Sequence, residues 1–122
     1  MQYLRIYAGP DGASHFATVA PELTPVEFVP GLPLVDLSSP TPATASAFAR
    51  LPAGWYGDYH PTPRQQFVIA VSGTVDITTS DGETRRITPG TVIRLDDTTG
   101  SGHLTQVVGE TPWCCLLLWL TA

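Results

Sequence analysis

The sequence contains no lysine, and this absence excludes several kinds of chemistry. All six basic residues are arginines. Enzymes that form a Schiff base need a lysine amine, and the phosphate-binding loop of nucleotide hydrolases needs a lysine beside the phosphates. Neither mechanism is available to this chain. Eleven carboxylates against six arginines give a net charge of −5, so there is no basic surface for nucleic acid, and we expect no such partner.

Cysteines and long hydrophobic runs are also scarce. Cys114 and Cys115 are the only cysteines. Adjacent residues of a strand point to opposite faces, so we expect the two thiols to stay unpaired, as in a reducing compartment. The longest apolar run, Trp113 to Leu120, has eight residues, far fewer than the ~20 of a membrane-spanning helix. The N-terminus has no targeting pattern. We therefore expect a cytoplasmic protein without membrane contact.

Proline and glycine, in contrast, are frequent and scattered. Twelve prolines and eleven glycines interrupt the 122 residues, which favours short strands and turns over long helices. The length and the 43% hydrophobic content indicate one domain, residues 1–122, with one core. Seven of the prolines lie in residues 1–43. We expect this segment to be a proline-rich N-terminal arm with edge strands, packed on its own barrel or on that of a neighbouring subunit.

Residues 44–122 are expected to form a barrel of short strands. Val75 and Ile77 alternate with polar residues, and the tight-turn dipeptide Asp81-Gly82 follows, which predicts a hairpin. The Asp96-Asp97 pair is expected to cap a turn, with a catalytic role as the less favoured alternative. Such a series of strands predicts an all-β sandwich or barrel. The segment 113–120 is apolar on both faces and so needs a second cover. A homodimer would supply it.

A row of polar residues precedes an apolar strand near the middle of the chain. On an extended chain these residues would share one face that continues into Val68 and Ala70. They are Asp58, His60, Thr62, Arg64 and Gln66. An inward face that is polar at one end and apolar at the other is typical of a pocket mouth above a packed barrel floor.

Two segments resemble the motifs of the cupin superfamily. The first motif of that family, G-x5-H-x-H-x3,4-E-x6-G, is similar to the segment from Gly54 to Gly73, in which His60 and Gln66 have the motif's spacing. The second motif, P-x-G-x2-H, resembles residues 98–103, which end in a histidine. The resemblance covers about half of the chain.

This resemblance implies a double-stranded β-helix, a small jelly-roll barrel that is commonly dimeric and has a site inside. In metal-binding members, three histidines and a glutamate hold one divalent ion. Here His60, Gln66 and His103 would be the ligands of Fe, Mn, Ni or Zn. Thr62 stands in place of the second histidine, and Val107 in place of an asparagine. Two imidazoles and a neutral amide are a weaker ligand set, so a metal-free site stays open.

The candidate catalytic residues are His60, His103 and Arg64. Histidine transfers protons near neutral pH, and a guanidinium can bind a substrate carboxylate in two places. We expect the substrate to be bound by aromatic, acidic and neutral polar neighbours from the first motif. These are Trp55, Asp58, Tyr59, Thr62 and Gln66.

Each main candidate also has a purely structural interpretation. His60 would then be a turn histidine beside prolines, and His103 a core-edge histidine bonded to a carbonyl. Gln66 would bridge strands as a buried amide. Arg64 would pair with an aspartate at the rim. His15 is expected at the surface, in a loop before a strand.

The resemblance and the residues together suggest a function. We expect a small enzyme that acts on a small oxygenated metabolite inside the barrel, such as a keto or hydroxy acid, a sugar-like or an aromatic compound. A metal acting as Lewis acid, or histidine acid/base catalysis, would give isomerase, lyase or oxygenase chemistry. The alternative is a metal-free barrel that binds a small molecule without catalysis, as a sensor or accessory protein.

Overall fold

The chain folds into β-strands and the turns between them. The computed structural model describes residues 1–121, and within this range the regular structure consists of twelve strands. Their bounds are β1 (Tyr3–Ala8), β2 (Ser14–Val19), β3 (Leu23–Val26), β4 (Val35–Ser38), β5 (Ala43–Leu51), β6 (Tyr56–His60), β7 (Gln66–Ser72), β8 (Val75–Thr79), β9 (Thr84–Ile87), β10 (Val92–Leu95), β11 (His103–Val107) and β12 (Trp113–Leu120). The all-β prediction is confirmed. No helix in residues 1–121 combines the length and apolar character that a membrane crossing requires.

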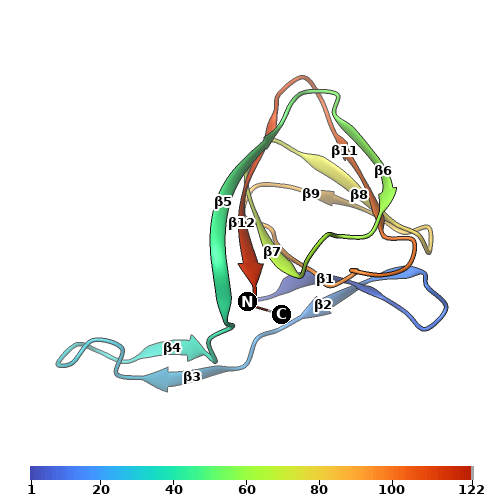
Figure 1. Ribbon diagram of the computed structural model, residues 1–122. Coiled ribbons are helices and arrows are strands. Elements are labelled where there is room, and N and C mark those ends of the chain that lie inside the picture. Colours follow the sequence, from blue (N-terminus) through green and yellow to red (C-terminus); the bar gives the residue numbers. More distant parts are fainter. Residues whose placement is uncertain (122) are drawn as a thin grey trace.

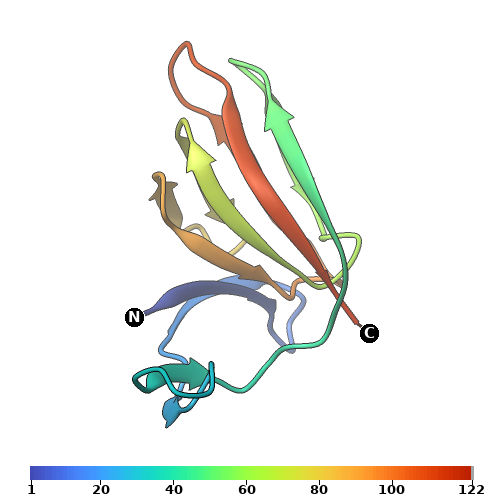
Figure 2. The ribbon, with the colours of Figure 1, turned by 90° about the vertical axis from the view of Figure 1, so that its left-hand side faces the viewer.

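The strands of residues 1–121 form two larger sheets and one small one. The first sheet has six strands in the order β2-β1-β10-β7-β12-β5, and the second has four in the order β6-β11-β8-β9. The two sheets face each other (Figures 1 and 2). From β5 onward the chain crosses repeatedly between them, so that it closes into the predicted jelly-roll barrel.

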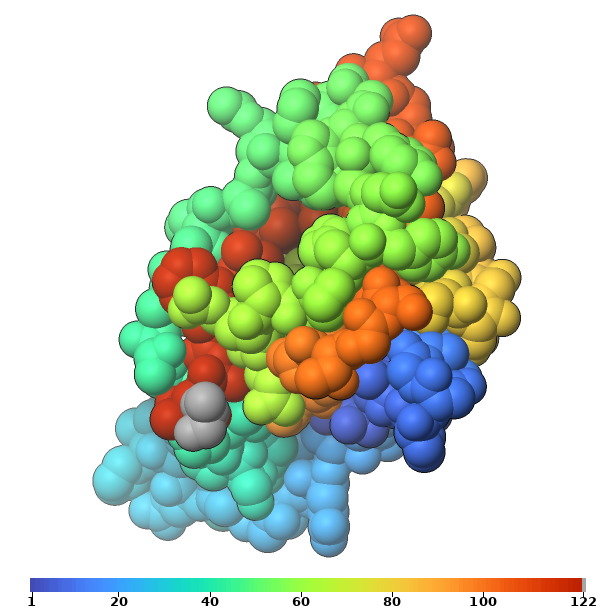
Figure 3. Space-filling view, turned by 45° about the vertical axis from the view of Figure 1, so that its right-hand side comes forward, coloured from blue at the N-terminus to red at the C-terminus, as the bar shows by residue number. Residues whose placement is uncertain are grey.

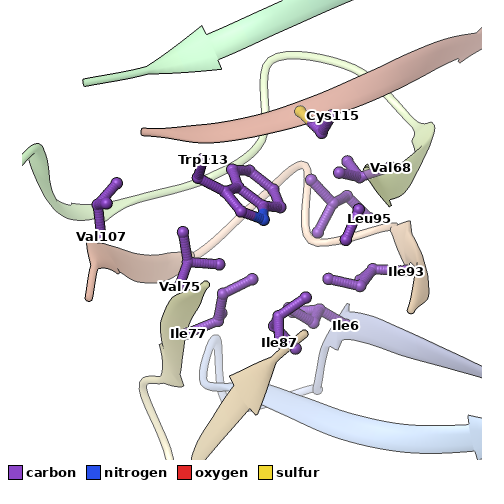
Figure 4. Close-up of a cluster of buried hydrophobic side chains, with 11 residues drawn as sticks. Ile6, Val68, Val75, Ile77, Ile87, Ile93, Leu95, Val107, Trp113 and Cys115 are labelled. Carbon is purple, nitrogen blue, oxygen red and sulfur yellow. The ribbon is translucent and has the colours of Figure 1, made fainter. Parts of the chain in front are cut away.

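Buried side chains from the facing sheets form the hydrophobic core (Figure 4). Ile6 of β1, Val75 of β8 and Ile87 of β9 are fully buried, and each such side chain stabilises the fold by about 1.5–3 kcal/mol relative to exposure. The predicted hairpin is present, because β8 pairs with β9 in the register Val75 to Ile87. Its turn contains Gly82 at φ 97°, a conformation that only glycine adopts without strain.

The segment expected to be an N-terminal arm is divided in two. Its first part enters the barrel: β1 lies between β2 and β10 in the six-stranded sheet. Only the hairpin of β3 and β4 stands apart, and in residues 1–121 these two strands hydrogen-bond only with each other. Figure 1 shows this hairpin beyond one end of the barrel, next to the start of β5.

The last strand, β12, has two apolar faces, as predicted. Trp113 and Cys115 point into the core and are buried, whereas Cys114 lies on the opposite face and is half-buried. Both thiols are free. Burial, with a smaller contribution from Cys114, raises the pKa of the Cys115 thiol to about 11, so this thiol stays protonated and behaves as a small hydrophobic group.

Asp96, directly after β10, connects three parts of the six-stranded sheet. Its carboxylate accepts hydrogen bonds from Arg5 of β1 at 2.6 Å, from Arg94 of β10 at 3.0 Å and from Gln65, just before β7, at 3.0 Å. Burial alone would raise the pKa of Asp96, but the two arginines outweigh it and hold the pKa below the ordinary 3.8. The turn cap predicted from the sequence is therefore a charged connection between strands.

We expect Asp96→Asn to lower the free energy of unfolding by about 1–3 kcal/mol at pH 7, because hydrogen bonds to a charged acceptor are weakened. Since the pKa of Asp96 is lower in the folded state, its stabilisation is fully present above about pH 4 and is lost as the pH falls through the folded value. Urea unfolding at pH 7 and pH 3 measures both effects, and the difference from wild type should shrink at pH 3.

Asp76→Asn is the matched control. Asp76 pairs with Arg86 at the surface, where the arginine side chain is 61% exposed, and such a pair contributes at most about 1 kcal/mol. Equal losses of stability in the two variants would contradict the connecting role of Asp96.

Candidate functional site

A cavity of about 170 Å³ opens between the two sheets. Its wall is mainly apolar and is formed by side chains such as Leu51, Val68 and Leu95. Its polar lining comes from β6, β7 and β11. Figure 3 shows a hollow bordered by the green segment that carries β6, with red β12 behind it. This is the combination of apolar wall and few polar groups that is typical of a small-molecule site.

His103 lies on the cavity wall and is held by a buried carboxylate. Its Nδ1 is 2.6 Å from Oδ2 of Asp97. The His103 residue is only 5% exposed and Asp97 is 0% exposed. Because a carboxylate accepts, Nδ1 carries the proton and donates it, so the Nε2 of the neutral ring keeps its lone pair. When a buried carboxylate orients an imidazole in this way, the imidazole can act as a general base and the carboxylate supports it.

His60 faces His103 from the neighbouring strand. The two residues are register partners in the pairing of β6 with β11, and their ring centroids are 5.6 Å apart. The Nδ1 of His60 donates to the backbone carbonyl oxygen of Asp58 at 2.7 Å. The Nε2 of neutral His60 is therefore also unprotonated. The two rings thus present the same chemical group, an imidazole lone pair, to one end of the cavity.

Gly102 makes this close pairing possible. It adopts φ 70°, and a Cβ at this position would collide with the backbone of His60. Only glycine allows the chain that enters β11 to approach β6 so closely. The glycine directly before His103 therefore serves to bring the two imidazoles together.

Gln66 and Thr62 form a hydrogen-bond chain that sets the direction of the glutamine amide. The Nε2 of Gln66 donates to Oγ1 of Thr62 at 3.0 Å, and this hydroxyl donates to the backbone carbonyl of Arg64 at 3.1 Å. The buried Oε1 of Gln66 has no partner among the described residues. Gln66 lines the cavity, so it offers an acceptor there. Thr62 supports this amide and does not itself line the cavity.

Two tryptophans complete the cavity. Trp55, predicted as a substrate-binding residue, lines it together with Trp113. The indole Nε1 of Trp113 is buried and has no hydrogen-bond partner in residues 1–121. Figure 4 shows this nitrogen directed into the space between the core side chains. It is a donor without an acceptor, which is costly in an apolar interior unless a ligand satisfies it.

Three predicted site residues lie elsewhere. Arg64, expected to bind a substrate carboxylate, is exposed and stacks on the ring of Trp119 at 4.3 Å. Tyr59 is 44% exposed and does not line the cavity. Asp58 is also exposed, and only its backbone carbonyl contacts His60. Asp58 and Tyr59 lie within β6 and Arg64 lies in the connection to β7, and all three residues are exposed.

His15 lies away from the cavity, whereas Asp97 lies directly behind its wall. His15 is half-buried and lies 3.0 Å from a carboxylate oxygen of Asp81, away from the cavity. Asp97 was expected mainly to cap a turn, with a catalytic role as the less favoured alternative, and the structure places it against His103. The signal available in the sequence was an acidic residue six positions before the histidine of a Gly-rich loop. Nothing in that pattern tells which of the adjacent residues, Asp96 or Asp97, faces inward.

The donor atoms around the two histidines do not fit a firmly bound divalent ion. The side chains offer two imidazole nitrogens and the Oε1 of Gln66, all neutral. Within residues 1–121 no group of three or more His, Cys, Asp or Glu is placed to hold a metal. The nearby carboxylate, Asp97, already accepts from the opposite side of the His103 ring. No negative charge would offset the ion, so a divalent metal would be bound only weakly here.

Solved structures of other proteins share this architecture. A Cupin 2 conserved barrel domain protein from Salinispora arenicola matches 63% of this chain and 62% of its own, with 19% identity and a TM-score of 0.52. The DMSP lyase DddQ from Ruegeria pomeroyi matches 82% of this chain and 47% of its own, with 21% identity and a TM-score of 0.54. In both cases the match spans less than two thirds of the other chain.

A third match is a sugar phosphate isomerase of the cupin superfamily from Silicibacter pomeroyi. It covers 100% of this chain and 71% of its own, with 14% identity and a TM-score of 0.51. No family model and no curated protein matches the sequence. At these identities the likeness concerns the fold alone. The barrel is a cupin fold, as the two motifs predicted.

We expect neutral His60 and His103 to carry their ring proton on Nδ1. Long-range ¹H–¹⁵N correlation spectra of labelled protein at pH 8 distinguish the two tautomers. In Asp97→Asn the new amide can donate to Nδ1, so the Nε2-protonated form of His103 should become populated while His60 is unchanged. A wild-type spectrum with the proton of His103 on Nε2 would contradict the geometry of the site.

Proposed function

We propose that this small cupin-fold protein is an enzyme that binds a small oxygenated metabolite in its barrel and moves a proton on it, in a reaction of the isomerase or lyase type. The observation that carries the proposal is the buried pair of His103 and Asp97, joined at 2.6 Å on the cavity wall. A histidine held by a carboxylate and facing a mainly apolar cavity has little structural purpose, since a hydrophobic side chain would fill the same space at lower cost.

His103 acts as the base in this proposal. Its Nε2 lone pair accepts a proton from a carbon next to a carbonyl group, and Asp97 stabilises the imidazolium that forms. The indole N–H of Trp113 is the donor available for the carbonyl oxygen, where negative charge develops. Gln66 accepts the hydrogen bond from a hydroxyl group of the substrate and so orients it, and His60, which lines the same cavity, offers a second acceptor. The proton then returns from His103 to the substrate.

The structural neighbours are compatible with this proposal. Two proteins with the same fold carry the names of a lyase and an isomerase. Many chemistries occur on one fold, so the argument rests on the residues of this cavity and not on those names. The alternative is a barrel that binds a small molecule without catalysis, and the weak metal-ligand set is the observation that favours it.

Deuterium exchange tests proton abstraction directly. We expect wild-type protein to accelerate exchange of the α-protons of cyclohexanone in D₂O, followed by NMR. His103→Ala should remove the acceleration, and Asp97→Asn should reduce it at least about tenfold, because general base catalysis is worth roughly 10²–10⁴. Asp96→Asn is the matched control, since its carboxylate belongs to the sheet and not to the cavity.

The remaining outcomes separate the proposal from its alternative. Prolonged treatment with EDTA should leave the exchange rate unchanged, and a loss restored by one divalent ion would contradict the metal-free proposal. A ketone that binds in the cavity without faster exchange would favour the binding barrel. Equal exchange rates in wild type and His103→Ala would remove the proposed role of the histidine.

A further inference from the structure

The cavity offers hydrogen-bond acceptors in excess over donors. With the imidazoles neutral, His60 and His103 each present an Nε2 lone pair, and Gln66 presents the unpartnered Oε1. The unpartnered donor is the Nε1–H of Trp113, which is directed between the core side chains. A ligand that satisfies these groups must bring a hydroxyl donor for the acceptors and an acceptor for the indole N–H.

No cationic side chain faces this cavity. The sequence has no lysine, and none of its six arginines lines the cavity. Arg64, the candidate for a carboxylate contact, stacks on Trp119 outside it. Asp97 adds a buried carboxylate behind His103. An anionic ligand would thus lose its hydration, meet negative charge and find no counter-ion, which is strongly unfavourable.

The size of the cavity limits the ligand as well. Its volume is about 170 Å³, close to the ~150 Å³ of an apolar cavity that accommodates benzene. Aliphatic side chains and two tryptophans form most of the wall. The ligand is therefore about as large as one six-membered ring and largely apolar.

From these observations we infer that the cavity takes a small neutral hydroxycarbonyl compound and rejects carboxylates and phosphates. This inference rests on the proposed function, and it names the substrate class. The hydroxyl donates its one proton to Oε1 of Gln66, and the carbonyl accepts from Trp113.

The proposed step balances for this class. The C–H electron pair on the hydroxyl-bearing carbon becomes the new C=C bond, while the carbonyl π pair moves to the oxygen and gives an enediolate. The proton goes to Nε2 of His103. Return of that proton to the other carbon, with a proton shift between the oxygens through His60, completes an isomerisation without any redox partner.

Binding of three matched ring compounds tests the class. We expect 2-hydroxycyclohexanone to bind at pH 8 at least tenfold more tightly than 2-methoxycyclohexanone, which lacks the donor. Cyclohexanecarboxylate should not bind measurably. Isothermal titration gives the affinities, and quenching of tryptophan fluorescence reports occupancy beside Trp55 and Trp113.

Gln66→Leu removes one acceptor and nearly keeps the side-chain size. It should reduce the preference for the hydroxyl compound to less than about threefold, while affinity for the methyl ether is retained, which also shows that the variant is folded. Tighter binding of the carboxylate than of the hydroxyl compound, or an unchanged preference in Gln66→Leu, would overturn the substrate class. The proton-transfer role of His103 would be unaffected by either result, because the exchange experiment measures it separately.

Discussion

The site depends on the close approach of β6 to β11. His60 and His103 are register partners, and Gly102 lets the two backbones come together where any Cβ would collide. The backbone pairing places the two imidazoles side by side, with an angle of 40° between their ring planes. Their ring protons are held on the outer nitrogens by a carbonyl and by Asp97. Strand pairing thus sets the position of the reactive groups, and hydrogen bonds behind them set their protonation.

Two neighbouring carboxylates have different roles: Asp96 stabilises the six-stranded sheet, and Asp97 orients His103. Asp96 and Asp97 follow the same strand, but one accepts from arginines of the six-stranded sheet and the other from His103 inside the barrel. The first is neutralised by two guanidinium groups. The second has an oxygen that is buried without a partner. Such an unsatisfied group is costly for folding, and Asp97, which does not line the cavity, contributes to the site through its hydrogen bond with His103.

Local patterns predicted much of the fold. The alternation around Val75 and the turn at Gly82 predicted the hairpin of β8 and β9, and the apolar run of residues 113–120 predicted a strand with two apolar faces. The motif spacing singled out His60, Gln66 and His103, which the structure brings to one cavity. The N-terminal segment was harder, because prolines indicate edge strands without telling which of them enter the sheet.

By itself, the sequence determined the strands, the turns and the kinds of group available: imidazoles, an amide, no lysine. The tertiary structure decided which of these groups meet. It turned Asp97 inward and Arg64 outward, and so removed the cation that a carboxylate substrate would need. The reason is that both residues lie in connections between strands. The direction of a side chain there depends on which segments the tertiary fold brings alongside, and this long-range arrangement has no local signal.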